Sequence, residues 1–187
     1  MNKKIIGYVI GILLIGTMVV LMVKSNIGET EPSEKAVNSV QNEGLEKGNV
    51  PPDFELTTLT GDVVKLSELK GEKVILNFWA SWCGPCKAEM PHMQKYYEKN
   101  KDSSNVEIIA VNMTTQERKG IEGIENFVES YGLTFPIPLD EEGVVIDTYK
   151  VMSIPTTYMI GTDGKIVHKI VGPMDEKTME DLVENIE

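Results

Sequence analysis

The chain contains only two cysteines, Cys83 and Cys86, and two residues separate them. They follow the apolar run 74–79, which is typical of a buried strand. If a helix begins at this motif, its unpaired amide groups and the positive end of its dipole favour a thiolate at Cys83. Cys86, one helical turn further on, can then attack the same sulfur and expel a partner held there as a mixed disulfide. The spacing therefore predicts a redox dithiol, with Cys83 as the nucleophile and Cys86 as the resolving cysteine.

The residues around this dithiol allow a partner chain to approach. Pro85 suits the first helical turn, where its missing amide hydrogen costs no hydrogen bond, and Gly84 leaves room for another backbone. Trp82 is expected to form a partly exposed lip of the site, whereas Trp79 is expected in the core. We therefore expect Trp82, Gly84 and Pro85 to border the substrate groove.

Other uses of two cysteines were weighed against the redox interpretation. A structural zinc site needs four ligands, but the chain has no second cysteine pair and its two histidines lack a compact ligand spacing. Covalent haem attachment requires a histidine directly after the motif, where this chain has Lys87. A structural disulfide remains an alternative, although so short a loop constrains the unfolded chain little. A non-enzymatic thiol binding module or copper chaperone is a further alternative, but the nearby Met90 and Met93 are better explained as core residues. The sequence predicts neither a metal nor another cofactor.

The segments on both sides of the motif alternate between strand-like and helix-like patterns, which indicates an α/β domain with a mixed central sheet flanked by helices. Pro91 is expected to kink the helix that starts at the motif, and Gly132 stands where a helix C-cap belongs. The predicted elements are a hairpin at 54–66, a short helix at 67–70, a strand at 74–79, a helix at 83–99, a strand at 106–111, a helix at 121–131, a hairpin of strands 156–160 and 165–171, and a final helix near 179–186.

A separate apolar segment lies near the start of the chain. Residues 5–23 are 19 residues without a charge, and as a helix they would extend about 28 Å, enough to span a hydrocarbon core. Lys3 and Lys4 precede the segment, so the positive-inside rule places the N-terminus in the cytoplasm and the rest of the chain on the far side. A cleaved signal peptide is the alternative, but no small-residue cleavage site follows. The sequence favours an uncleaved anchor at 1–24 with a single helix that crosses the cell membrane.

Composition divides the remaining chain in two. Residues 25–49 are polar and predict a flexible linker, whereas residues 50–187 have the composition of a folded domain. The formal net charge is −11, and all of it belongs to residues 50–187, because five lysines balance five glutamates in residues 1–49. Such an acidic domain disfavours nucleic acid as a partner and would attract a basic client, although acidity also serves solubility. We expect a monomer.

Three separated features agree with one known fold. They are Trp82-Cys83-Gly84-Pro85-Cys86 after a strand, a helix interrupted by Pro91, and Ile154-Pro155-Thr156 before a later strand. This order resembles the thioredoxin fold. With the N-terminal anchor, the opening hairpin and an enlarged segment at 113–153, the chain is similar to the TlpA/ResA family of bacterial extracytoplasmic thiol-disulfide oxidoreductases. The resemblance covers residues 50–187 and implies a thioredoxin-like domain with an N-terminal β-hairpin and a central helix-strand insertion, here the helix at 121–131 and a strand at 135–139.

The resemblance also implies roles for individual residues. Cys83 and Cys86 match the redox pair of the family. Pro155 matches the proline that faces the dithiol and is preceded by a cis peptide bond, and Ile154 and Thr156 would border the client groove.

An acidic residue completes the catalytic set that the resemblance implies. Glu89 matches an acidic residue that family members place beneath the active site, where a buried carboxyl would exchange a proton with Cys86. Thioredoxin has a buried aspartate on the strand before its motif, but this chain has Asn77 there. Any acid-base function must therefore lie elsewhere, which strengthens the case for Glu89.

The sequence thus predicts thiol-disulfide exchange with protein clients outside the membrane. The resemblance implies a reductant, for example in cytochrome c maturation or sporulation, supplied by a membrane thiol-disulfide electron donor. A peroxiredoxin-like thiol peroxidase is the enzymatic alternative. That class has a threonine three residues before its reactive cysteine, where this chain has Ala80.

Overall fold

The computed structural model describes residues 17, 43–101 and 103–186 of the 187-residue chain. Residues 43–186 belong to one compact unit. The predicted anchor and most of the predicted linker lie outside the described residues. Within the described part, no helix combines the length and the apolar character needed to cross a membrane.

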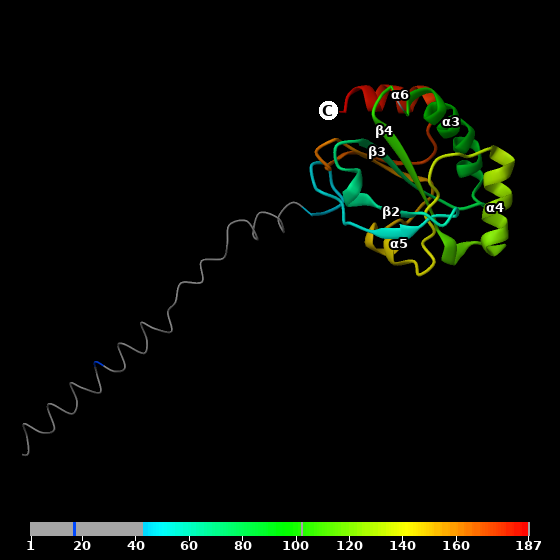
Figure 1. Cartoon of the computed structure of the whole chain (residues 1–187), viewed down its shortest axis with the longest axis horizontal. Coiled ribbons are helices and arrows are strands. Elements are labelled where there is room, and N and C mark those ends of the chain that lie inside the picture. The colour runs from blue at the N-terminus through cyan, green and yellow to red at the C-terminus, as the bar shows by residue number, and fades with distance from the viewer. Residues whose placement is uncertain (1–16, 18–42, 102, 187) are drawn as a thin grey trace, which may run out of the picture. The chain divides into compact units, whose positions relative to one another are not determined.

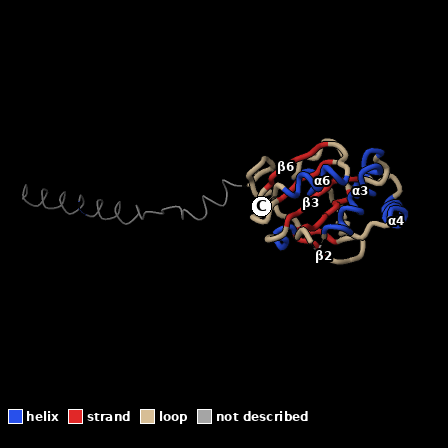
Figure 2. The backbone as a smooth tube through the Cα atoms, turned by 90° about the horizontal axis from the view of Figure 1, so that it is seen from above, coloured by secondary structure: helices blue, strands red, loops and turns tan. Residues whose placement is uncertain are grey.

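A mixed four-stranded sheet in the order β4-β3-β5-β6 forms the middle of the domain (Figure 2). Strand β3 (Lys73–Trp79) pairs in parallel with β4 (Val106–Asn112) and antiparallel with β5 (Thr156–Ile160), which in turn pairs antiparallel with β6 (Ile166–Val171). The parallel pair is the βαβ unit predicted around the dithiol. The antiparallel pair is the predicted second hairpin, so both sequence predictions are confirmed.

Side chains of β3 alternate between two hydrophobic clusters. Ile75 and Trp79 belong to one cluster, and Leu76 and Phe78 belong to the other. Such alternation follows from the period of two along a strand, and both faces are apolar because both are covered. Asn77 is the polar exception on the face of Ile75 and Trp79.

Helices α3 (Gly84–Asn100) and α6 (Glu176–Glu184) cover the first face, and α4 (Gly120–Tyr131) completes this layer (Figure 1). The predicted kink at Pro91 does not divide the helix, because α3 continues through this residue. Gly132 ends α4 in the left-handed conformation (φ 61°), as the C-cap prediction required.

The second face is covered by smaller elements. Strands β1 (Glu55–Thr57) and β2 (Val63–Lys65) form the predicted N-terminal hairpin, and the 3₁₀ helix η1 (Leu66–Leu69) and helix α5 (Val144–Thr148) pack beside it. Figure 1 shows α5 on the side of the sheet opposite α3 and α6. The predicted mixed sheet with helices on both faces is therefore present.

The strand predicted at 135–139 is wrong. This segment lies between β4 and the N-terminal hairpin, but it forms only isolated bridges, at Pro138 and Leu139. Backbone oxygens of Pro136 and Pro138 accept hydrogen bonds from β4. Since neither proline has an amide hydrogen to return, a regular ladder cannot form.

The linker boundary also requires correction. Residues 43–49 were assigned to a flexible linker, yet they pack against the start of β6. The amide of Gly48 donates to the Ile166 oxygen at 2.7 Å, and the Ile166 amide donates to the Asn49 oxygen at 2.9 Å. Leu45 contacts the second hydrophobic cluster. Backbone pairing with an exposed edge strand therefore orders a segment that composition alone describes as polar.

Candidate active site

The two cysteines lie where β3 gives way to α3. Cys83 is the N-cap of α3, and its sulfur accepts a hydrogen bond from the amide of Cys86 at 3.1 Å. The pair forms a disulfide. In the reduced chain, the same amide and the positive end of the helix dipole would stabilise a thiolate at Cys83.

Exposure distinguishes the two sulfur-bearing residues. Cys83 is 4% exposed and Cys86 is fully buried. Gly84 and Pro85 are exposed beside them, and Trp82 is half-buried. An incoming sulfur would therefore meet Cys83 first, as expected of a nucleophile with a resolving cysteine beneath it.

The segment before β5 closes the site from the opposite side. The peptide bond between Ile154 and Pro155 is cis, and the Ile154 oxygen lies 3.7 Å from the Cys83 sulfur. Thr156 is buried as the first residue of β5, and its hydroxyl donates to the Ser153 oxygen at 2.7 Å. The structure thus brings Ile154 to the dithiol, as the sequence predicted. It places the Thr156 side chain within the domain rather than on an open surface.

Glu89 is fully buried, one helical turn after Cys86 in α3. Its Oε2 accepts a hydrogen bond from Asn77 Nδ2 at 3.1 Å, and its Oε1 accepts one from the Met174 amide at 3.0 Å. Burial raises the pKa of this carboxyl to about 7, although the two hydrogen bonds partly oppose the shift. The group is therefore poised to gain or lose a proton near neutral pH.

Asn77 joins this carboxyl to the sheet. Its Nδ2 also donates to the Thr157 hydroxyl at 2.8 Å, whereas its Oδ1 has no hydrogen-bond partner among the described residues. The hydrogen bond from Asn77 lowers the pKa of Glu89, but burial of the carboxyl outweighs this effect. Sequence reasoning noted Asn77 as a departure from thioredoxin but missed its contact with Glu89, and it missed Thr157 and Met174 altogether.

Sequence reasoning also missed Glu117, which fixes the loop before the dithiol. Its Oε1 accepts hydrogen bonds from the Ser81 amide at 2.7 Å and from Asn112 Nδ2 at 2.8 Å, and its Oε2 accepts one from the Ser81 hydroxyl. The preceding 3₁₀ helix η2 (Thr114–Gln116) holds Trp82, whose Nε1 donates to the Gln116 oxygen at 2.8 Å. No local pattern marks a glutamate 34 positions after Cys83, since the contact arises only when β4 lies beside β3.

Comparisons with known proteins agree with this geometry. The model of the AhpC/TSA family matches residues 48–169. The thioredoxin-like protein YneN of Bacillus subtilis is 44% identical over 137 residues, which cover 73% of this chain and 78% of the relative. The thiol-disulfide oxidoreductase ResA of the same organism is 41% identical over 139 residues, which cover 74% of this chain and 75% of the relative.

Solved structures give the same answer. StoA from Bacillus subtilis superposes with a TM-score of 0.63 at 35% identity, over 71% of this chain and 96% of that structure. A putative thiol:disulfide interchange protein DsbE from Chlorobium tepidum gives a TM-score of 0.67 at 34% identity, over 75% of this chain and 97% of that structure. The fold is therefore thioredoxin-like. Because the family model spans most of the domain and ResA aligns over three quarters of its own length, the chain belongs to the AhpC/TSA family and is a ResA-like thiol-disulfide oxidoreductase.

Proposed function

We propose that this oxidoreductase reduces disulfides of protein clients outside the cytoplasmic membrane, to which its N-terminal segment anchors it. The observation that carries the proposal is the Cys83–Cys86 pair at the start of α3, with the ionisable Glu89 buried beneath it. The charge-free segment 5–23 after Lys3 and Lys4 supports the location.

The reaction begins from the reduced dithiol. The Cys83 thiolate attacks one sulfur of the client disulfide, which forms a mixed disulfide and releases the other client sulfur as a thiolate. Cys86 then loses its proton and attacks the Cys83 sulfur, which expels the second client thiolate. The client gains two electrons, its two thiolates take up protons from water, and the chain is left with the Cys83–Cys86 disulfide found in this structure.

Glu89 is the proton acceptor in the second step. Cys86 is buried, so water cannot readily take its proton. With a pKa raised to about 7, the Glu89 carboxylate is basic enough to accept that proton, and the resulting neutral carboxyl suits its buried site.

A reductant in this location needs electrons from elsewhere. We propose that a membrane thiol-disulfide partner reduces the Cys83–Cys86 disulfide after each turnover, and that the chain acts as a monomer. Clients of the kind implied by ResA-like relatives, apocytochromes awaiting haem or proteins of spore maturation, would each present a disulfide for reduction. Peroxide reduction is a weaker candidate, because Ala80 offers no hydroxyl to a bound peroxide.

Two measurements on the full chain test this function. Insulin-disulfide reduction should be lost in Cys83→Ser and retained in Lys47→Glu, a change at an exposed residue outside the site. Unchanged activity in Cys83→Ser would refute the proposed chemistry.

The direction of electron flow is tested by the reduction potential of the Cys83–Cys86 pair, followed by tryptophan fluorescence in dithiothreitol or glutathione buffers. A value near or below about −250 mV supports a reductant, whereas one above about −180 mV indicates an oxidant or isomerase.

A further inference from the structure

A groove of about 750 Å³ opens beside the dithiol, between the motif and α4. Trp82, directly before Cys83, and Lys87, directly after Cys86, both line it. Neither cysteine lines the groove, but a molecule lying in it would contact the residues directly before and after the dithiol. We call it the cationic groove and define it by Trp82, Lys87, Arg118, Lys119, Asn126 and Ser130.

The groove is positive in an otherwise acidic chain. It is lined by Lys87, Arg118 and Lys119, all exposed, and by no aspartate or glutamate of the described residues. None of the three forms a salt bridge within the part of the chain that the structure describes. The formal net charge of the whole chain is −11. Three cations without a salt bridge in one groove therefore form a local positive region on an acidic protein.

Helix α4 carries several acids but keeps them out of the groove. Lys119, Asn126 and Ser130 line the groove from one side of the helix, whereas Glu122, Glu125 and Glu129 do not line it. Asn126 Nδ2 donates to the Glu122 backbone oxygen at 2.8 Å, and the Ser130 hydroxyl donates to the Asn126 oxygen at 2.6 Å. The groove side of α4 thus carries no acidic side chain, although the helix as a whole is acidic. It combines Lys119, Asn126 and Ser130 with Gly123, Phe127 and Tyr131.

The wall nearest the dithiol is fixed before anything binds. Trp82 Nε1 is held by the Gln116 oxygen, and the Arg118 guanidinium lies 4.6 Å from the centre of the Trp82 ring. This cation–π contact stabilises the pair without neutralising the charge. Glu117 lies between these residues in the sequence, but its carboxylate is occupied by Ser81 and Asn112. A partner would therefore lose little affinity to ordering this wall.

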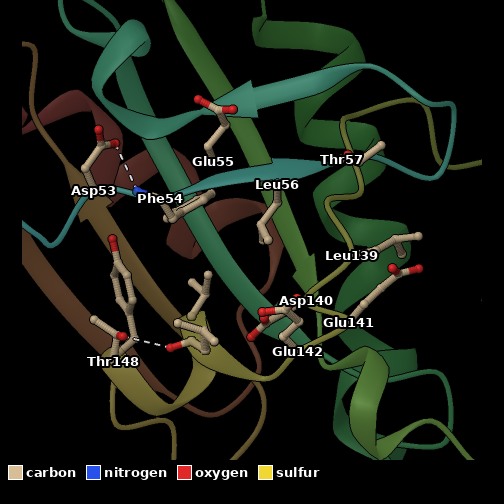
Figure 3. A pocket seen from close by; sticks show the side chains of 13 residues that line it. Asp53, Phe54, Glu55, Leu56, Thr57, Leu139, Asp140, Glu141, Glu142 and Thr148 are labelled. Carbon is tan, nitrogen blue, oxygen red and sulfur yellow. Dashed lines mark hydrogen bonds between the residues drawn. The ribbon is translucent and has the colours of Figure 1, made fainter.

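A second pocket shows the opposite charge. It has a volume of about 610 Å³ and lies between the N-terminal hairpin and α5 (Figure 3). Its lining includes five carboxylates and, among the described residues, no lysine, arginine or histidine. They are Asp53, Glu55, Asp140, Glu141 and Glu142. Charge is therefore segregated on this domain, and the positive part adjoins the cysteines.

We propose that the cationic groove docks an acidic segment of the client, beside the dithiol, and so selects the clients that react. This inference rests on the proposed function and names the chemistry of its partner. It opposes the expectation from net charge, because a chain of charge −11 would attract basic clients if long-range attraction alone decided.

The test uses three synthetic peptides and the reduced full chain in a neutral detergent. Each peptide carries one cysteine as a mixed disulfide with thionitrobenzoate, and they differ only in three flanking residues, which are Glu, Gln or Lys. One turnover oxidises the dithiol and releases one peptide thiol and one coloured thionitrobenzoate anion. At about 20 mM salt the Glu peptide should react about tenfold faster than the Gln peptide, with the Lys peptide slowest, and about 500 mM salt should shrink the differences.

Two charge-reversal variants distinguish the effect of the groove from the effect of the net charge of the whole chain. Lys119→Glu should remove the advantage of the Glu peptide, and Lys119→Gln should remove part of it. Lys47→Glu changes the net charge equally but lies at the other end of the sheet, beside Gly48, which bonds to Ile166. Ile166 pairs with Ile160, whereas the dithiol lies near the Thr156 end of β5. Lys47→Glu should therefore keep the order of the three peptides.

Other results overturn the inference. Rates within twofold of one another, a fastest Lys peptide, or an equal loss of preference in Lys47→Glu would each contradict docking in the groove. If neither the peptides nor the uncharged 2,2′-dipyridyl disulfide reacted with the reduced chain, the proposed function would fail and the inference with it. Equal but rapid rates would overturn the inference alone.

Discussion

At the scale of single residues, Glu89 links folding to pH. Its folded-state pKa of about 7 lies above the value of 4.5 expected in the unfolded chain. Between these values the folded chain holds a proton that the unfolded chain releases, so the contribution of Glu89 to stability is fully present below pH 4.5 and is lost as the pH rises through 7. Glu89, one helical turn after Cys86, therefore lowers the free energy of unfolding at neutral pH relative to acidic pH.

This coupling predicts the behaviour of Glu89→Gln. The free energy of unfolding of the oxidised wild-type chain should fall by about 2.5 kcal/mol relative to the variant between pH 5 and pH 8, since each pKa unit is worth about 1.4 kcal/mol. Urea denaturation at the two pH values measures the difference. Glu125→Gln removes an exposed carboxylate and is the matched control, which should follow the wild type. Parallel pH profiles for wild type and Glu89→Gln would show that Glu89 does not titrate in this range.

At the scale of elements, sequence patterns correctly predicted the helices and strands that depend on residues close together in the sequence. The run 74–79, the helix at the cysteines and the hairpin around the turn 161–164 were predicted because burial, capping and turn residues act over a few positions. The strand at 135–139 was predicted because the segment 113–153 is longer than the thioredoxin fold needs, but the prolines within it remove the amides that pairing needs.

Contacts between distant elements were not predictable in the same way. The family resemblance favoured a buried Glu89. The Met174 amide that donates to Glu89 lies 85 residues away, and no local pattern predicts that contact. Glu117 is a similar case, because it reaches Ser81 across the parallel pair β3 and β4. The order of residues 43–49 likewise depends on β6, more than 100 positions later in the chain.

Helix α4 makes a prediction at this scale through Gly123. Alanine normally stabilises a helix relative to glycine by up to about 1 kcal/mol. Here a Cβ would meet Lys119 Cβ at 2.7 Å, so the N-cap residue Lys119 would have to move away from the first turn of α4, whereas Ser81 Oγ at 3.8 Å is in ordinary contact. We expect Gly123→Ala to destabilise the chain by about 1–3 kcal/mol in urea denaturation. Glu125→Ala, at an exposed position in the same helix, should have little effect. A stabilising Gly123→Ala would show that Lys119 moves aside from the added methyl group at little cost.

At the scale of the whole molecule, the proposed reaction requires the dithiol to lie on the far side of the membrane from the cytoplasm. The chain offers its own reporter, because its only two cysteines are in the site. In Cys86→Ser, the remaining Cys83 thiol in intact, reduced cells should react with a membrane-impermeant maleimide. Reversing the flanking charges with Lys3→Glu and Lys4→Glu should lower this labelling. Lysines before an apolar segment keep the N-terminus in the cytoplasm, so their loss weakens the preference for this orientation. The matched control is labelling after lysis, which should be equal in both chains. Labelling that appears only after lysis would place the cysteines in the cytoplasm, where the thiol pool already supplies reductant and a membrane donor is unnecessary.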